Sequence, residues 1–111
     1  MAYTVIKSVF KKEDKGQHGF NFVYDESVPA NTEVLLRMPS VNAFTRSVND
    51  IGWMTDGTNV DIYATLCEDL VSNTMWEKVE ENYDINKTAS GLRIVNSGST
   101  PARVVIRVIM C

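Results

Sequence analysis

His18 is the single histidine in the sequence and stands in the glycine-flanked stretch KGQHGF. Any serine or cysteine nucleophile that relied on a histidine base would have to use this residue. One histidine and two distant cysteines, Cys67 and Cys111, are also too few for a zinc site, and no CxxC spacing occurs. We therefore expect His18 to lie in a solvated loop, and we expect no metal ion and no cofactor.

Oxygen-bearing side chains gather in the stretch DGTNVD, where Asp56, Asn59 and Asp61 could together ligate calcium. The stretch departs from the EF-hand pattern, because Gly57 is misplaced and no glutamate follows at the required distance. An Asp-Gly pair between apolar runs is a strong turn signal. The sequence therefore favours a turn at residues 56–57 over a calcium site.

Paired carboxylates could serve as acid and base in glycoside hydrolysis if one of them had a raised pKa in a cleft. The candidate acidic residues form two groups, Glu68 with Asp69 and Glu77 with Glu80 and Glu81. Nothing in the sequence indicates a cleft around them, and acidic residues in loops and at strand ends are usually solvated. We predict that the protein is not an enzyme and has no catalytic residues.

Trp53 and Trp76, together with Tyr63 and Tyr83, could form a platform on which sugar rings stack. Tryptophans also bury large areas in small β domains, so packing in the core or in an interface competes with this interpretation. A solvent-facing tryptophan would favour a carbohydrate- or ligand-binding module, and buried tryptophans would count against it. Such a module is the alternative function that the sequence leaves open.

The chain of 111 residues has the length of one domain, which we assign to 1–111. Its net charge of -3 argues against nucleic acid as a partner, because nucleic-acid-binding proteins usually carry a basic face. It contains no run of about 18 apolar residues, so we expect no membrane span. The first residues lack the pattern of a secretion signal, so we expect synthesis in the cytoplasm, with both cysteines reduced and not bonded to each other.

Apolar residues recur with a period of two in most segments, and turn residues separate these segments. The pattern predicts an all-β fold, a single-domain antiparallel β-sandwich of jelly-roll type. Residues 11–19 are expected to form a charged loop, and residues 39–52 a long surface loop in which a short strand is left open. The segment 70–82 fits a short helix as well as a strand, and its β neighbours favour a strand over part of it. Strands are expected at residues 2–10, 20–25, 32–38, 53–55, 60–67, 90–96 and 102–110.

The chain closes on SGLRIVNSGSTPARVVIRVIMC, two apolar-rich runs around a turn-forming stretch, which predicts a β-hairpin. One face of the second run is entirely apolar, and the opposite face carries Arg103, Val105, Arg107 and Ile109. A sheet surface in contact with water is normally more polar. Either this strand is central and covered by its own molecule, or a partner chain covers it. We favour the partner and expect the four residues to lie in or near a contact between copies of the chain.

The strand layout is carried by three stretches, FNFVYDESVPANTEVLLRM, VDIYATLCEDLVSNTMWEKV and SGLRIVNSGSTPARVVIRVIM. With this layout the chain resembles, over its whole length, small bacteriophage virion proteins of the capsid decoration (cement) type. The resemblance implies a non-enzymatic structural protein with a β-sandwich or jelly-roll fold. It implies that the partners are further copies of the chain, often in a trimer, and a major capsid or other virion protein. The virion would then be its location.

Overall fold

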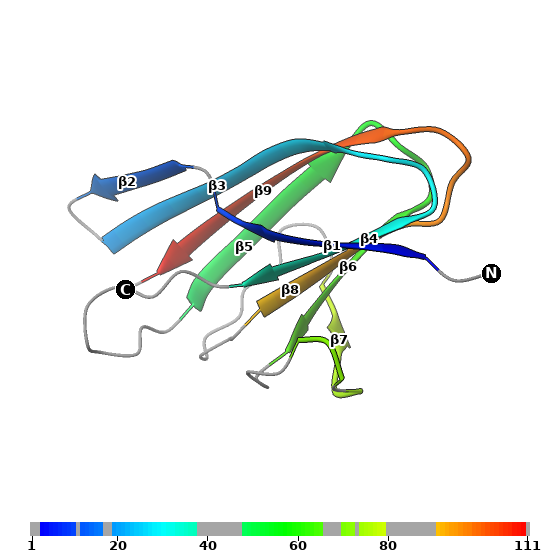
Figure 1. Cartoon of the computed structure of the whole chain (residues 1–111). Helices are drawn as coiled ribbons and strands as arrows, with labels where there is room; N and C mark the ends of the chain where they lie inside the picture. Colours follow the sequence, from blue (N-terminus) through cyan, green and yellow to red (C-terminus); the bar gives the residue numbers. More distant parts are fainter. Residues whose placement is uncertain are drawn as a thin grey trace.

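The computed structural model describes residues 3–10, 12–16, 19–37, 48–65, 70–72, 74–79 and 91–110. Over these residues the chain forms nine strands and no helix, so it has no helix long and apolar enough to cross a membrane (Figure 1). In chain order the strands are β1 (Thr4–Val9), β2 (Lys12–Gly16), β3 (Gly19–Val28), β4 (Thr32–Arg37), β5 (Val48–Thr55), β6 (Val60–Thr65), β7 (Glu77–Lys78), β8 (Gly91–Asn96) and β9 (Ala102–Met110).

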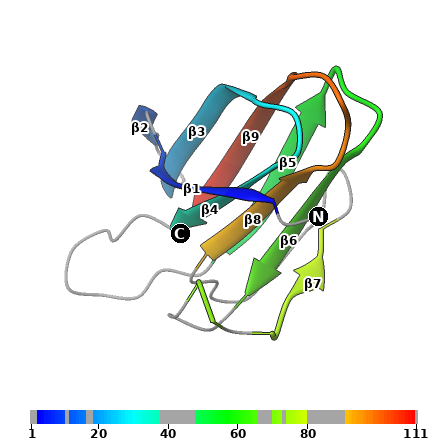
Figure 2. The same ribbon diagram turned by 45° about the vertical axis from the view of Figure 1, so that its right-hand side comes forward.

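The strands form two sheets that pack face to face, which confirms the predicted β-sandwich (Figure 2). Within the described residues, sheet A has the order β1-β4-β8-β6-β7, and sheet B has the order β2-β3-β9-β5. Every pairing between these strands is antiparallel except that of β1 with β4, which is parallel. Since β3 and β5 flank β9 on its two sides, the terminal strand lies inside sheet B and has no open edge.

The core lies between the two sheets and is built by the residues that the period-two pattern sends inward. On β3, Phe22 and Tyr24 are buried as expected, and on β4 so are Val34 and Leu36. Alternation gives each strand one apolar face, and these faces cover each other when the sheets stack. Further buried members of this core are Val28, Ile51, Val60, Ile62, Ala64, Val79, Leu92, Ile94, Ala102, Val104, Ile106 and Val108.

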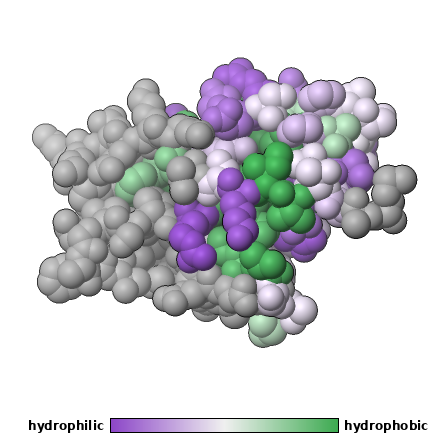
Figure 3. All heavy atoms as spheres, viewed as in Figure 1, coloured by the Kyte–Doolittle hydropathy of each residue, from purple (hydrophilic) through white to green (hydrophobic). Residues whose placement is uncertain are grey.

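The outer face of sheet A is more apolar than a simple sandwich requires. Leu35 on β4 and Val95 on β8 are buried although they alternate with core residues, and Val5 and Ile6 on β1 are exposed. Figure 3 shows hydrophobic residues gathered over the region of β1, β4 and β8, next to a group of hydrophilic ones. This sheet therefore carries apolar side chains on both of its faces.

The hairpin expected for the last 22 residues is wrong. β8 pairs with β4 and β6 in sheet A, whereas β9 pairs with β3 and β5 in sheet B, so residues 97–101 carry the chain from one sheet to the other. The turn at residues 56–57 likewise joins strands of different sheets, β5 and β6. In both places the predicted order of strand, turn and strand is correct. The two strands lie in different sheets, so they face each other across the core and do not pair with each other.

Two expected loops contain strands. Residues 12–16 form β2, an edge strand of sheet B, although their sequence is largely charged. β5 begins at Val48, inside the expected loop 39–52, while residues 38–47 lie outside the described residues. In the open segment 70–82, residues 70–72 form a turn and the described strand is the short β7, with no helix over its described residues.

Candidate functional site

An arginine and a glutamate face each other on the outer surface of sheet A. Arg93 on β8 lies beside Glu33 on β4, with Nε 2.8 Å from Oε1. Arg93 Nη2 donates a hydrogen bond to Oε2 at 3.1 Å. The Nε–H is not aligned with a hydrogen-bond acceptor in the described residues, so its short contact is an ion pair and not a second hydrogen bond. The pair is largely shielded from water, since the side chains of Arg93 and Glu33 are 29% and 15% exposed.

Two aromatic rings flank the same guanidinium. Arg93 Cζ lies 5.6 Å from the ring centre of Tyr63 on β6 and 6.0 Å from that of Trp76. Both distances fall within the range of cation–π attraction. The guanidinium is therefore held by a carboxylate and by two aromatic rings from other segments of the chain.

Residues 70–72 and 74–76 form a wall beside this group. Leu70 is buried against Gly91, where an added Cβ would lie 2.5 Å from Leu70 Cδ2. The glycine thus leaves the space that Leu70 fills. The wall and the sheet enclose a cleft of about 410 Å³, called the outer cleft below. Its lining residues are Glu33, Tyr63, Leu70, Val71, Thr74, Trp76 and Arg93.

A second surface lies at the end of the sandwich where three connections cross between the sheets. Residues 29–31 join β3 to β4, residues 56–59 join β5 to β6, and residues 97–101 join β8 to β9. Figures 1 and 2 both show the three connections side by side at this end. We call this surface the three-loop tip.

Asn96 holds two of the three loops together from inside. Asn96 is 2% exposed, and its Nδ2 donates to the carbonyl oxygens of Val28, Pro29 and Thr100 at 3.1 to 3.2 Å. Its Oδ1 accepts a hydrogen bond from Gly98 N at 3.0 Å. A buried amide with its polar atoms bonded in this way fixes the backbone around it.

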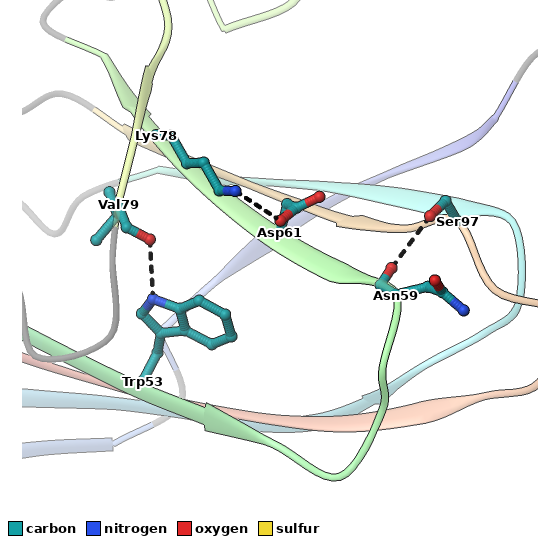
Figure 4. Close-up of polar contacts among 6 residues, drawn as sticks. All are labelled: Trp53, Asn59, Asp61, Lys78, Val79 and Ser97. Atoms are coloured by element: carbon teal, nitrogen blue, oxygen red, sulfur yellow. Dashed lines mark hydrogen bonds and ion pairs between the residues drawn. The ribbon is translucent and has the colours of Figure 1, made fainter.

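Hydrogen bonds between the loops complete the tip. Asn31 N donates to Gly98 O, and Ser97 N donates to Asn59 O at 3.0 Å. Ser97 Oγ also donates to Asn59 O, as Figure 4 shows. Asn31 has a φ of 51°, in the left-handed region that asparagine tolerates better than most residues. The three loops are therefore fixed to one another by their own backbone.

The two tryptophans do not form one platform. Trp53 lies on β5 in sheet B, packs against the core and donates its indole N–H to Val79 O at 3.1 Å (Figure 4). Trp76 lines the outer cleft on the far side of sheet A and lies over Arg93. Tyr63 lies with Trp76 in this cleft, whereas Tyr83 is outside the described residues.

The oxygen-bearing residues of DGTNVD are engaged with protein groups. Asp56 Oδ1 accepts a hydrogen bond from Arg103 N at 2.9 Å, and Asp61 lies 3.4 Å from Lys78 Nζ (Figure 4). Within the described ranges, no group of three or more His, Cys, Asp or Glu residues is placed to hold a metal ion. Residues 56–59 connect β5 to β6, in agreement with the change of chain direction predicted at residues 56–57.

The face of β9 that we expected in a contact points outward from sheet B. Arg103 and Arg107 are exposed, Val105 is half-buried, and the side chain of Ile109 is outside the described residues. Arg103 makes a bidentate pair with Asp25 on β3, Nε to Oδ1 at 2.9 Å and Nη2 to Oδ2 at 2.8 Å. The hydrogen bond from Arg103 lowers the pKa of Asp25 and raises that of Arg103 itself.

Several residues with chemical potential lie outside the described residues, namely His18, Cys67, Glu68, Asp69, Glu80, Glu81 and Cys111. Glu77, on β7, is exposed. The expectations about His18, the thiols and most of these carboxylates therefore stay predictions.

Sequence reasoning missed Glu33, Arg93 and Asn96. Arg93 and Glu33 are 60 positions apart and meet only because β4 and β8 pair. Asn96 did leave a signal, because it is a polar residue at a core-facing position directly before a turn. A buried asparagine at such a place usually holds loop backbone.

Solved structures of the same fold include two inhibitors. PliG of Aeromonas hydrophila, a periplasmic lysozyme inhibitor of g-type lysozyme, aligns over 99% of this chain and 100% of its own, with 5% identity and a TM-score of 0.65. PliG of Salmonella Typhimurium, which has the same description, aligns over 96% of this chain and 98% of its own, with 9% identity and a TM-score of 0.56. At such identities the likeness shows the fold alone.

Sequence comparison adds no family. No family model matches the chain, and no curated protein matches it.

The likeness to these inhibitors overturns the virion interpretation. The similar structures are periplasmic inhibitors that bind an enzyme, not capsid decoration proteins. The expected partners, further copies of the chain in a trimer and a capsid protein, are therefore wrong. The expected location, the virion for a protein that is not secreted, is wrong as well. The alternative of a carbohydrate- or ligand-binding module is also unsupported, and the two tryptophans lie on different surfaces.

Proposed function

We propose that the protein is a non-enzymatic inhibitor that binds a lysozyme and acts in the periplasm. The observation that carries the proposal is the extent of the likeness: the sandwich matches two g-type lysozyme inhibitors over nearly the whole of both chains. A match of this extent includes the strands and the crossings between the sheets, and not only a shared pair of strands.

The described side chains are consistent with a binding role. The carboxylates of Asp25, Glu33, Asp56 and Asp61 each lie against a cation or accept a backbone N–H. A protein that binds by shape needs rigid surfaces, because a preorganised surface loses less conformational entropy on association.

The proposal is tested by adding the purified protein to g-type lysozyme and following the clearing of a bacterial cell-wall suspension. We expect inhibition that rises with protein concentration and saturates once the lysozyme is fully bound. A calorimetric titration of the two proteins should give a matching stoichiometry. Full lysozyme activity at saturating protein, together with no heat of binding, would overturn the proposal.

Two controls make this assay specific. A c-type lysozyme in the same suspension shows whether the effect depends on the class of lysozyme or on the cell walls. The protein after irreversible thermal unfolding, at the same concentration, shows whether the folded sandwich is required.

A further inference from the structure

The edge strands of the two sheets are not equally protected against the addition of a further strand. Over the described residues, β1 and β7 are the edges of sheet A, and β2 and β5 are the edges of sheet B. An edge strand has unpaired backbone N–H and C=O groups on its outer side. Proteins usually guard such an edge with charged residues, with a bulge or by keeping the strand very short.

Three of these edges carry such a guard, and β1 differs from them. The sequence of β2, KEDKG, is charged at all of its positions except the glycine. β7 is only two residues long, and the register of β5 is irregular between Val48 and Asp50. β1 is a strand of six residues, TVIKSV, that pairs with β4 in continuous register and contains one charged residue, Lys7.

The free side of β1 presents the backbone groups of Val5 and Lys7. Thr4 N donates at 3.1 Å to the carbonyl oxygen of Asn31, the residue before β4, so the backbone groups of Thr4 point to the β4 side. Successive residues of a strand direct their N–H and C=O groups to alternate sides. The N–H and C=O groups of Val5 and Lys7 therefore point away from β4, where a further strand could bond to them.

The side chains at this edge are apolar and exposed, with one cation among them. Val5 is 52% exposed and Ile6 is 38% exposed. The register places Val5 beside Glu33 on the outer face of sheet A, and Ile6 beside the core residue Val34 on the inner face. Lys7 is exposed and forms no ion pair with the described residues. An added strand would cover two apolar side chains and meet one positive charge.

We propose that the free edge of β1 binds an extended peptide segment of a partner protein as a further, antiparallel strand of sheet A. The segment would exchange backbone hydrogen bonds with Val5 and Lys7, which is how proteins bind peptides at a sheet edge. In this orientation an acidic residue lies opposite Lys7, and the two residues after it lie opposite Ile6 and Val5. The edge therefore fits an acidic residue followed by two apolar ones.

The charge of Lys7 selects among the strands that could pair here. A lysine on an edge strand disfavours pairing with most other strands. The same lysine stabilises a strand that places a carboxylate directly opposite, whereas a like charge in that position is destabilising. This inference goes beyond the proposed function and does not depend on it, because a sheet edge could hold a peptide whether or not the protein inhibits a lysozyme.

The experiment uses the synthetic peptide Thr-Thr-Glu-Ile-Val-Thr-Thr with blocked ends, and a matched peptide with lysine in place of the glutamate. Each is titrated into the ¹⁵N-labelled protein. The glutamate peptide should shift the amides of Val5 and Lys7 most, because these N–H groups gain hydrogen bonds. The amides of Thr4 and Ile6, which point to the β4 side, should shift less. The lysine peptide should bind about tenfold more weakly.

Three variants test how the peptide is recognised. Lys7→Glu should reverse the preference, so that the lysine peptide binds about tenfold more tightly than the glutamate peptide. Val5→Pro removes an outward N–H at an edge position that tolerates proline, and it should lose detectable binding. Lys78→Glu reverses a charge on β7, at the opposite edge of the same sheet, and should bind both peptides like the unchanged protein. Thermal unfolding checks that each variant is folded, and the charge reversal at Lys7 decides the question if Val5→Pro does not fold.

Several results would overturn the inference. They are no binding of the glutamate peptide up to its solubility limit, equal affinity for the two peptides, and amide shifts centred away from β1. If the amides of Val5 and Lys7 shift with protein concentration alone, the edge pairs with a second copy of the chain, and the assignment to a partner peptide is wrong. Inhibition of lysozyme is measured separately, so its presence or absence leaves these outcomes unchanged.

Discussion

The three-loop tip and the outer cleft are held together by different kinds of contact. The tip is fixed by main-chain hydrogen bonds and by the buried amide of Asn96. The outer cleft is assembled from side chains, with Leu70 seated on Gly91 and the guanidinium of Arg93 between a carboxylate and two rings. Both surfaces combine residues that are distant in the sequence, but only the tip is fixed mainly through its backbone.

Because of this difference, the two surfaces should respond differently when one of their side chains is changed. A loop fixed through its backbone keeps its shape when an exposed side chain changes, so its outer residues can vary without loss of the tip. A cleft built from side chains changes shape with each of its lining residues.

Removal of the Asn96 amide should have the largest effect. Asn96→Leu keeps the approximate volume but leaves three carbonyl oxygens and the Gly98 N–H without this partner at a buried site. We expect a loss of about 3 kcal/mol in the free energy of unfolding, measured with urea. Asn59→Ala, at an exposed side chain of the same tip, should change the free energy by less than about 0.5 kcal/mol. Similar values for both variants would show that the tip is not held from inside.

Tyr24, which is buried in the core, makes the stability of the fold depend on pH. Burial, with a smaller contribution from Glu26, raises its pKa to about 12 from an ordinary value of 10.0. The unfolded chain therefore loses this proton first as the pH rises. The contribution of Tyr24 to stability is complete below pH 10 and falls between pH 10 and pH 12, by up to about 2 kcal/mol.

The variant Tyr24→Phe isolates this effect, because it removes the ionisable group and keeps the ring. Urea unfolding between pH 9 and pH 12 should show a smaller loss of stability for the variant than for the unchanged protein. If the stabilities of the two proteins fall in parallel over this pH range, the Tyr24 hydroxyl is not harder to ionise in the folded chain than in the unfolded one.

The side-chain construction of the outer cleft is probed at Gly91. In Gly91→Ala the new Cβ would lie 2.5 Å from Leu70 Cδ2, so the Leu70 side chain must move away from the sheet. We expect the free energy of unfolding to fall by about 1 kcal/mol. The loss is smaller than for Asn96→Leu because the new Cβ meets only the flexible end of the Leu70 side chain. Leu70→Ala makes the space that Gly91→Ala needs, so the double variant should be more stable than the sum of the two single losses implies. Strict additivity in this cycle would mean that the two residues do not share the space.

The smallest effect is expected on the face of sheet B that carries the terminal strand. Arg103→Gln removes the ion pair with Asp25, but this pair is exposed and well screened by water. Urea unfolding should give the same midpoint for Arg103→Gln as for the unchanged protein. A clear fall in the midpoint would show that this face is more important for the fold than its exposure suggests.

The strands were largely predictable, and their partners were not. Alternation identified the buried faces of β3, β4 and β6 because each of these strands has one side in the core. It missed β2 because KEDKG carries no apolar face, and the pairing of β2 with β3 comes from the backbone. The turn residues at 56–57 and 97–101 mark a change of direction, but they do not distinguish a hairpin from a crossing between sheets.

The candidate surfaces were less predictable than the strands. Trp76 was identified as a binding candidate from its type alone, whereas its neighbours Arg93 and Glu33 are brought to it by the order of strands in sheet A. The face Arg103, Val105, Arg107 and Ile109 was singled out because it looked too apolar for water. The sequence left two interpretations open, a central strand and a strand covered by a partner, and β9 is central in its sheet, with Arg103 paired to Asp25.

The central claim, that the protein binds a lysozyme, is tested most directly by nuclear magnetic resonance. The ¹⁵N-labelled protein is titrated with unlabelled g-type lysozyme, and the perturbed backbone amides are mapped on the structure. We expect the perturbed amides to cluster on one surface of the folded sandwich and the changes to saturate with added lysozyme. No change at saturating lysozyme, or small changes spread over the whole sandwich, would contradict this claim.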